Sequence, residues 1–179
     1  HSVTRAALEP GYGYLRIASF TDTTPIDVER ALAAFRAEQR APLRIRGGGT
    51  KDFYGGPLAG DVVDTKVYAG IIDYEPTELV LTARAGTSLA AIESAMRARG
   101  QMLAFEPPHF CEGATVGGCV ASGLSGPRRA TAGSARDFVL GVKVLDGKGE
   151  ILNFGGQVMK NVAGYDVSRL MAGALGTLG

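Results

Sequence analysis

The sequence contains few of the residues on which metal and disulfide chemistry depend. Its 179 residues include two cysteines, two histidines and no tryptophan. Two cysteines are too few for a disulfide-stabilised fold, and Cys111 and Cys119 do not form a C-x-x-C pair. With only His1 and His109 present, a histidine-based zinc site is not expected. We therefore predict no bound metal and a cytoplasmic location, where thiols stay reduced.

The sequence also lacks an excess of either charge and any long apolar segment. The 19 Lys and Arg residues nearly balance the 18 Asp and Glu residues, for a net charge of +1. This balance gives no support for binding nucleic acid or a membrane surface through bulk charge. No apolar run reaches the roughly 18 residues that would cross a bilayer. Any anion must therefore be bound by local groups, and we expect no nucleic-acid partner.

Glycine, by contrast, is abundant. The chain has 26 glycines, about twice the usual share. They cluster without a fixed period at residues 47–49, 55–60, 113–126 and 155–179. Because glycine has no Cβ, backbone N–H groups can approach a ligand closely. Several clusters in a chain that also has enough apolar residues for a core predict a long ligand lying against backbone.

The pattern of apolar residues predicts an α+β fold with two lobes. Residues 1–20 give no clear prediction. Strands are expected at 43–46, 61–64, 70–74 and 79–85, with helices from Thr24-Pro25 to Pro42 and at 88–99, the latter ended by Gly100. In the second half, a hairpin joins 138–145 to 150–154 through Asp146-Gly147-Lys148-Gly149, and a short helix follows at 165–172. We place a small α/β lobe at about 1–85 and an antiparallel lobe with helices at about 86–179.

The first candidate binding segment is a glycine loop after a strand, Arg46-Gly47-Gly48-Gly49-Thr50-Lys51. Three consecutive glycines allow successive N–H groups to point the same way and form an anion nest, flanked here by two basic residues and a hydroxyl. The alternative is a flexible turn. The loop does not match the Walker A pattern, and Asp52 stands where the Rossmann fingerprint needs its third glycine.

Three further segments carry glycine or charge at positions that suit a ligand. Small residues fill 113–126, which suits backbone beside a flat ligand or, alternatively, tight helix packing. Residues 133–141 place Arg136 and Asp137 at the start of a strand. The two residues lie either beside the ligand or in a surface turn with a salt bridge. In the last segment, Gly173 and Gly176 permit close backbone approach, Asp166 is expected to cap a helix, and Lys160 is either a phosphate or partner contact or a solvated side chain.

The sequence identifies no catalytic group. There is no G-x-S-x-G motif. His109 is expected to be structural, with a position facing the flat ligand as the alternative. Cys111 and Cys119 are interpreted as small buried apolar residues. Arg128-Arg129 is either a docking surface or a solvated pair.

These segments, in this order, resemble the FAD-binding domain of the vanillyl-alcohol oxidase (PCMH) type. Within that type the chain resembles the glycolate oxidase (glycolate dehydrogenase) E-subunit family over about residues 12–179. The resemblance rests on residues 46–53, 74–80, 100–103, 105–109, 126–129 and 155–171, of which 160–171 are the most specific.

The resemblance implies FAD between the two lobes, with its pyrophosphate on the first glycine loop and the small-residue segment. Members with covalent flavin carry a histidine where this chain has Thr50-Lys51, so noncovalent FAD is implied. The residues expected to contact the cofactor are Arg46, Gly47, Gly48, Gly49, Thr50, Lys51, Pro107, Thr115, Gly117, Gly118, Ala121, Ser122, Gly126, Asp137, Val139, Gly173 and Gly176.

The resemblance also implies a role in oxidising glycolate, or a related small 2-hydroxy acid, within a complex. The partners would be a flavin-binding D-type subunit and an iron–sulfur F-type subunit, which would bring the protein to the inner membrane. The groups that act on the substrate are expected mainly in the D-type subunit, and the substrate-binding cap C-terminal to this chain. The alternative is a non-catalytic subunit that keeps the flavin fold for assembly or electron relay. A nucleotide-binding module of another kind would need a Walker or Rossmann pattern.

Overall fold

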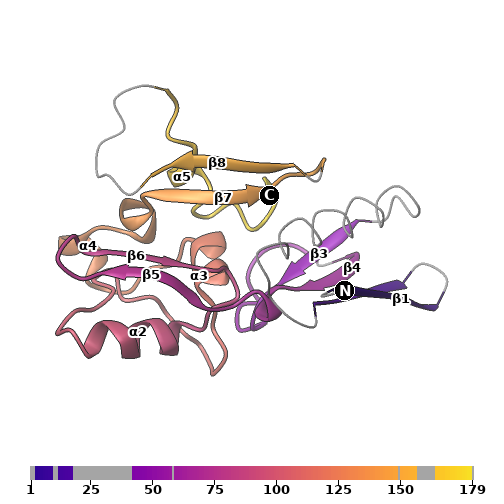
Figure 1. Ribbon diagram of the computed structural model, residues 1–179, viewed down its shortest axis with the longest axis horizontal. Coiled ribbons are helices and arrows are strands. Elements are labelled where there is room, and N and C mark those ends of the chain that lie inside the picture. Colours follow the sequence, from indigo (N-terminus) through magenta and orange to yellow (C-terminus); the bar gives the residue numbers. More distant parts are fainter. Residues whose placement is uncertain are drawn as a thin grey trace.

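The structure is a computed structural model that describes residues 3–9, 12–17, 42–57, 59–148, 150–156 and 164–178. The helix predicted between Thr24 and Pro42, and Lys160, lie outside these residues. The described elements come in runs, with strands first, then helices, then a strand pair and a last short helix, as expected for the predicted α+β fold. Figure 1 shows the hairpin β7–β8 with α5 at the top, β5, β6 and α2 below it, and β1 to β4 to one side.

The first four strands form two pairs. Strands β1 (Val3–Glu9) and β2 (Tyr12–Ile17) pair antiparallel, in a region for which the sequence analysis made no clear prediction. Strands β3 (Leu43–Arg46) and β4 (Asp61–Asp64) are parallel, with Arg46 opposite Asp64. The 3-10 turn η1 (Thr65–Val67) follows β4 directly. The parallel register therefore brings the glycine loop after β3 and the turn after β4 to the same edge.

The next unit is an antiparallel pair followed by a capped helix. Strands β5 (Ile71–Glu75) and β6 (Val80–Ala83) pair, and α2 (Leu89–Arg97) begins after Ser88, whose side chain accepts a hydrogen bond from Ala91 N. Gly100 has a φ of +69° and donates to Arg97 O at 3.0 Å, while Gln101 N donates to Met96 O at 2.9 Å. These two bonds form a Schellman motif, which confirms that Gly100 ends the helix.

The core lies where α2 meets the segment leading into α3 (Val116–Ser122). Buried residues of this core cluster are Leu89, Phe105, Ala114, Cys119 and Ala135. Two backbone bonds join the segments, Leu89 N to Ala114 O at 2.8 Å and Val116 N to Thr87 O at 2.9 Å. The small-residue segment is thus partly helical and tightly packed, as the helix-packing alternative predicts, and its place beside a ligand stays a prediction.

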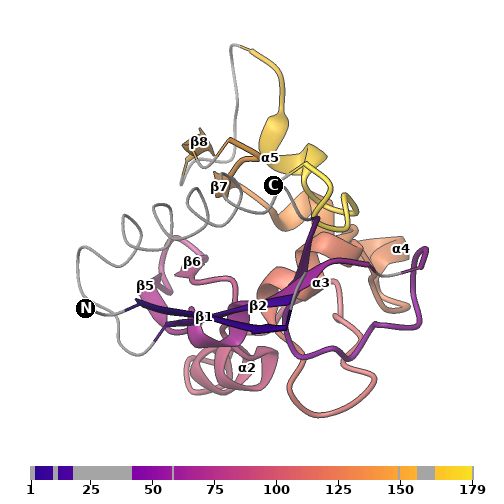
Figure 2. The same cartoon turned by 90° about the vertical axis from the view of Figure 1, so that its right-hand side faces the viewer.

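The remaining elements form a hairpin with helical turns on either side. They are α4 (Arg129–Ala132), η2 (Ala135–Phe138), β7 (Gly141–Leu145), β8 (Ile151–Gly155) and α5 (Val167–Leu170). Strand β7 starts three residues later than the predicted strand because 135–138 form a 3-10 turn. Asp166 accepts a hydrogen bond from Arg169 N, which confirms it as the cap of α5. Figure 2 shows β7, β8 and α5 at the opposite end of the molecule from α2, with α3 between them.

None of the helices in the described ranges is long and apolar enough to cross a membrane. The boundary near residue 85 between the two predicted lobes stays a prediction.

Candidate functional site

Three of the predicted binding segments lie against one another. A side chain on Gly47 would collide with Thr115, and one on Gly48 would collide with the carbonyl group of Gly113. Gly176 lies beside Ile45 of β3, since a Cβ on this glycine would be 3.5 Å from the Ile45 Cδ1 atom. The first glycine loop, the residues leading into α3 and the last segment therefore meet at the end of β3. Glycine is required at Gly48 because the two backbones touch there.

The glycine loop presents backbone donors that have no acceptor among the residues that the structure describes. Asp52 N donates to Gly49 O and Tyr54 N to Lys51 O, so the chain turns tightly after the loop. In the part of the chain that the structure describes, the N–H groups of residues 48–51 donate to no protein acceptor. These residues are half-buried, so water can satisfy their N–H groups until a ligand takes its place. An anionic group that accepts several hydrogen bonds, such as a phosphate, fits this loop.

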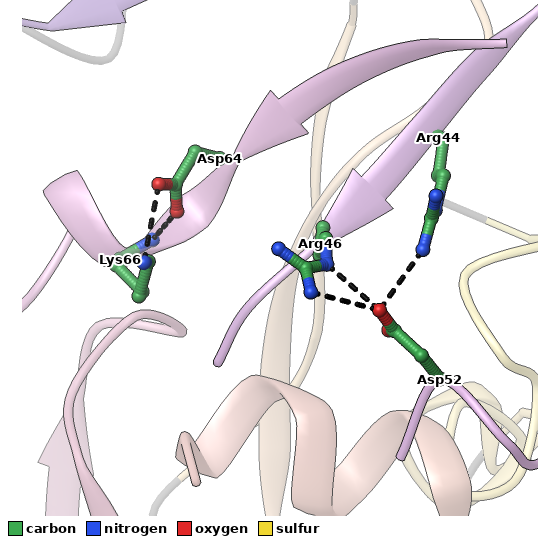
Figure 3. A network of polar contacts seen from close by, with 5 residues as sticks. All are labelled: Arg44, Arg46, Asp52, Asp64 and Lys66. Atoms are coloured by element: carbon green, nitrogen blue, oxygen red, sulfur yellow. Dashed lines mark hydrogen bonds and ion pairs between the residues drawn. The ribbon is translucent and has the colours of Figure 1, made fainter. Parts of the chain in front are cut away.

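Two arginines and one aspartate form an ion-pair cluster at this loop (Figure 3). Asp52 Oδ2 accepts from Arg44 Nη2 at 3.0 Å and from Arg46 Nε at 3.0 Å, and lies 2.8 Å from Arg46 Nη2. The hydrogen bond from Arg46 is the main reason that the pKa of Asp52 is lowered from its ordinary value. Arg46, predicted to be a flanking cation, is therefore already paired. In the neighbouring pair in Figure 3, Asp64 caps η1 by accepting from Lys66 N, and its carboxylate lies 3.5 Å from Lys66 Nζ.

Lys51 reaches across to the loop that precedes α3. Its Nζ atom lies over the ring of Phe110, 5.6 Å from the centroid, and Phe110 packs edge-on against Phe53 with centroids 5.0 Å apart. Desolvation is the main cause that lowers the pKa of Lys51, and the nearby Cys119 and Cys111 act in the opposite direction when ionised. Burial raises the pKa of Cys119 to about 11, so this thiol is protonated at neutral pH. Lys51 thus links the glycine loop to residues 110–119.

The two cysteines differ in their exposure to solvent. Cys119 is buried in the core, as predicted. The same prediction was wrong for Cys111, which is exposed because it follows Phe110 in a surface loop.

The amide groups at the start of α3 already have acceptors. Thr115 caps the helix by accepting from Gly118 N at 3.2 Å, and Gly117 N donates to Ala85 O at 2.8 Å. At the other end, Leu175 N donates to Ala121 O and the buried Ser122 Oγ donates to Cys119 O. Packing accounts for the small side chains here. The contacts with FAD expected of Thr115, Gly117, Gly118, Ala121 and Ser122 stay predictions.

The loop before α3 contains two strained residues that the sequence did not signal. Glu106 has a φ of +50° and Phe110 a φ of +61°, in the region that favours glycine. Between them lie Pro107, which is buried, and His109, whose Nε2 is 3.0 Å from Oε1 of Glu93 on α2. This contact gives His109 the structural role that was expected. Gly126 packs against Glu106, whose carboxylate accepts from Arg128 N at 3.0 Å.

The residues predicted near β7 lie in a local turn. The carboxylate of Asp137 accepts from Ser134 N and Ser134 Oγ, each at 2.8 Å, which lowers its pKa. This capping box agrees with the surface-turn alternative for Asp137. Val139 follows directly, and Gly173 joins α3 through its bond to Val120 O at 2.9 Å. The cofactor contacts of these three residues remain predictions.

Sequence reasoning missed Asp52, Glu93 and Phe110 as partners of predicted site residues. A signal existed for Asp52: Arg44 and Arg46 alternate along a strand and so share one face. Among the described residues, no cluster of three or more His, Cys, Asp or Glu side chains could hold a metal ion.

Residues 21–155 match the family described as FAD binding domain, which covers most of the chain. The chain belongs to this family. It is an FAD-binding domain, and the N–H groups of residues 48–51, which have no acceptor among the described residues, suit the diphosphate of that cofactor.

Two curated relatives illustrate the similarity. The chain is 56% identical over 140 residues to the glycolate oxidase subunit GlcE of Escherichia coli (strain K12), over 78% of this chain and 40% of that protein. It is 34% identical over 155 residues to the D-lactate dehydrogenase of Archaeoglobus fulgidus, over 83% of this chain and 33% of that protein. The chain thus spans well under half the length of these relatives.

Solved structures show the same fold. A structure of alkyldihydroxyacetonephosphate synthase matches with a TM-score of 0.68 at 20% identity, over 86% of this chain and 28% of that one. At this identity the likeness concerns the fold alone. It supports the PCMH-type FAD-binding fold that the sequence predicted.

Proposed function

We propose that this chain holds FAD noncovalently, as the flavin domain of a glycolate-type 2-hydroxy-acid oxidase or dehydrogenase subunit. The observation that carries the proposal is the row of unpaired N–H donors at residues 48–51, in contact with the residues that lead into α3. The reaction would be the oxidation of glycolate to glyoxylate. Bound FAD supplies the two-electron acceptor for this oxidation, and the protein supplies binding and orientation.

The residues of the site have different roles in binding the cofactor. The amides of residues 48–51 bind the diphosphate, and the Thr50 hydroxyl adds a donor beside them. The guanidinium group of Arg46 gives the loop positive charge. Lys51 lies on Phe110, so it fixes the loop against the neighbouring segment while keeping a cation near the site. The further predicted contacts at Pro107, Gly126, Val139, Gly173 and Gly176 would line the rest of the cofactor.

The noncovalent mode follows from the residues in the glycine loop. Thr50 and Lys51 stand where covalent members carry a histidine. Acid precipitation of the purified full-length protein should therefore release all of its flavin into the supernatant. Yellow colour retained in the pellet would show a covalent bond and contradict this part of the proposal.

The substrate class is supported by the 56% identity to a glycolate oxidase subunit. By the same similarity, the protein would be cytoplasmic, would work with a flavin-binding D-type and an iron–sulfur F-type subunit, and would reach the inner membrane through them. One visible spectrum, recorded before and after adding glycolate to the assembled complex, tests the proposal. Flavin absorption that bleaches with glycolate is expected, and a colourless protein that gains no stability from FAD would refute it.

The same measurement on the isolated full-length subunit separates the alternative function. A subunit that binds FAD but is not reduced by glycolate without its partners would serve assembly or electron relay. Direct reduction of the isolated subunit by glycolate would exclude that alternative.

A further inference from the structure

The glycine loop is closed by a single carboxylate oxygen. Asp52 Oδ2 receives three contacts of 2.8 to 3.0 Å from Arg44 and Arg46. Both arginines belong to β3, which enters the loop, whereas Asp52 is the first residue after it. The ion pair therefore joins the two ends of the segment that carries the unpaired donors (Figure 3).

The Arg46 guanidinium also packs on the loop itself. Gly49 has a φ of +68°, and a side chain there would meet Arg46 Cζ at 2.6 Å and Nε at 2.9 Å. The planar group thus covers the face of Gly49 that glycine leaves open. The other end of Arg46 is fixed too, because its carbonyl group accepts from Thr65 Oγ1 at 3.3 Å. Asp52 holds the guanidinium in this position.

We propose that Asp52 is a positioning residue for the diphosphate of the cofactor, acting through Arg46. This inference rests on the proposed use of residues 48–51 as the diphosphate site. By holding Arg46 over Gly49, Asp52 keeps the loop in its donor-presenting shape before the ligand arrives. The ordering that a free loop would undergo on binding is then already complete, which is how preorganisation raises affinity.

The charge of Asp52 acts in the opposite direction, since a carboxylate near a diphosphate repels it. Two observations limit this repulsion. The carboxylate contacts two guanidinium groups, so the three residues together keep a net charge of +1. Its side chain is also 37% exposed, where water and salt screen its charge. Neutralising Asp52 would make the cluster more positive, which favours the diphosphate, but would also leave the loop less ordered. We expect the affinity lost with loop order to exceed the affinity gained from the added positive charge.

The test compares Asp52→Asn with the matched variant Asp73→Asn in the full-length protein after its flavin is removed. Asp73 is an exposed carboxylate on β5, away from the loop in sequence. The Kd is measured by calorimetry for FAD and for ADP, which shares the diphosphate but has no flavin ring. Asp52→Asn should raise both Kd values by a similar factor of ~10, and Asp73→Asn should leave them within about twofold, as expected for an exposed surface change.

A double-mutant cycle shows whether Asp52 acts through Arg46. In an Arg46→Met background, adding Asp52→Asn should change the Kd for ADP by less than about twofold, because the group it positions is gone. Independent effects of the two substitutions would overturn the inference. So would a tighter Kd in Asp52→Asn, which would make Asp52 only a repelling charge.

The outcomes also separate the inference from the function on which it rests. If the unmodified protein binds neither FAD nor ADP, the proposed diphosphate site fails, and the inference fails with it. If the unmodified protein binds both and Asp52→Asn binds them equally well, only the inference fails. A near-native melting temperature for Asp52→Asn is expected, since the pair is largely exposed, and Kd values are compared on folded protein in each case.

Discussion

The glycine loop at residues 47–51 and helix α3 are both rich in glycine, but they use it differently. In α3 the amides of Gly117 and Gly118 are bonded to Ala85 O and Thr115 Oγ1. In the loop, the amides of residues 48–51 have no protein acceptor in the described part of the chain. Glycine in α3 allows close packing, whereas glycine in the loop also leaves donors available for a ligand. Unpaired donors, and not glycine content, distinguish a binding loop from a packing contact.

The two regions are nevertheless joined. Gly48 touches the carbonyl group of Gly113, and Gly47 touches Thr115, which caps α3. The helix therefore serves as a support that fixes where the loop lies. A substitution in the loop should affect binding most, and one in the helix should affect stability most.

Gly48→Ala is expected to have the largest effect. Its Cβ would collide with the Gly113 carbonyl group, a backbone atom that cannot move aside locally. The loop must leave its place on the residues before α3, which costs about 1–3 kcal/mol of stability as overpacking does and removes FAD binding. Chemical denaturation and FAD titration measure the two effects. Gly56→Ala is the control, because a Cβ there meets nothing within 4 Å. Native FAD affinity in Gly48→Ala would contradict the close contact.

Gly117→Ala should lower stability but leave FAD binding largely intact, in contrast to Gly48→Ala. A Cβ there would lie 2.8 Å from Ala85 Cβ and Ala85 O, so α3 must shift and the free energy of unfolding should fall by about 1–3 kcal/mol. The amide of this residue is already bonded, so folded protein should keep most of its affinity for FAD. Calorimetry on the folded variant measures this. A loss of affinity as large as that of Gly48→Ala would show that α3 also donates to the ligand.

Thr115→Val tests the cap of α3 by itself. The substitution keeps the side-chain shape but removes the hydroxyl that accepts from Gly118 N at 3.2 Å. An N-cap of this kind contributes about 1 kcal/mol to stability, and thermal melting should show the loss. Thr115→Ser keeps the hydroxyl and should retain most of that stability. Equal melting temperatures for Thr115→Val and the unmodified protein would mean that the cap contributes nothing.

The smallest effect concerns pH. The pKa of Asp52 is lowered by the hydrogen bond from Arg46, so its charged form is favoured in the folded protein. The stabilisation is therefore complete above the unfolded pKa, near 4, and is lost as the pH falls through the lower folded pKa. The stability difference between the unmodified protein and Asp52→Asn should stay constant from about pH 5 to 8 and shrink in more acidic solution. A difference that changes between pH 6 and 8 would require another titrating group.

The local elements could be predicted from the sequence, because neighbouring residues decide them. The strand at 43–46, the Schellman glycine Gly100 and the cap at Asp166 follow from short-range patterns, and the structure confirms each. The start of β7 was predicted too early. The apolar residues from 138 onward indicated a strand, but Ser134 and Asp137 form a capping box that makes residues 135–138 a 3-10 turn.

The site itself was predictable only in part. The sequence identified the glycine loop, because three glycines after a strand are a local signal. It did not show that Lys51 would lie over Phe110, a residue 59 positions later in the chain (110 − 51). Nor did it show that Glu93 would contact His109 or that Cys111 would be exposed. These are contacts between segments, which depend on how the elements pack.

The sequence by itself determined the composition of the loop, its position after a strand and the family to which the chain belongs. Tertiary structure decided which glycines are bonded and which leave donors available. It also decided that Arg44 and Arg46 share one carboxylate oxygen of Asp52. The physical reason is that a backbone N–H is satisfied or unsatisfied by whatever acceptor packing brings to it. Residue type sets how closely two backbones can approach, and the fold sets which two backbones meet.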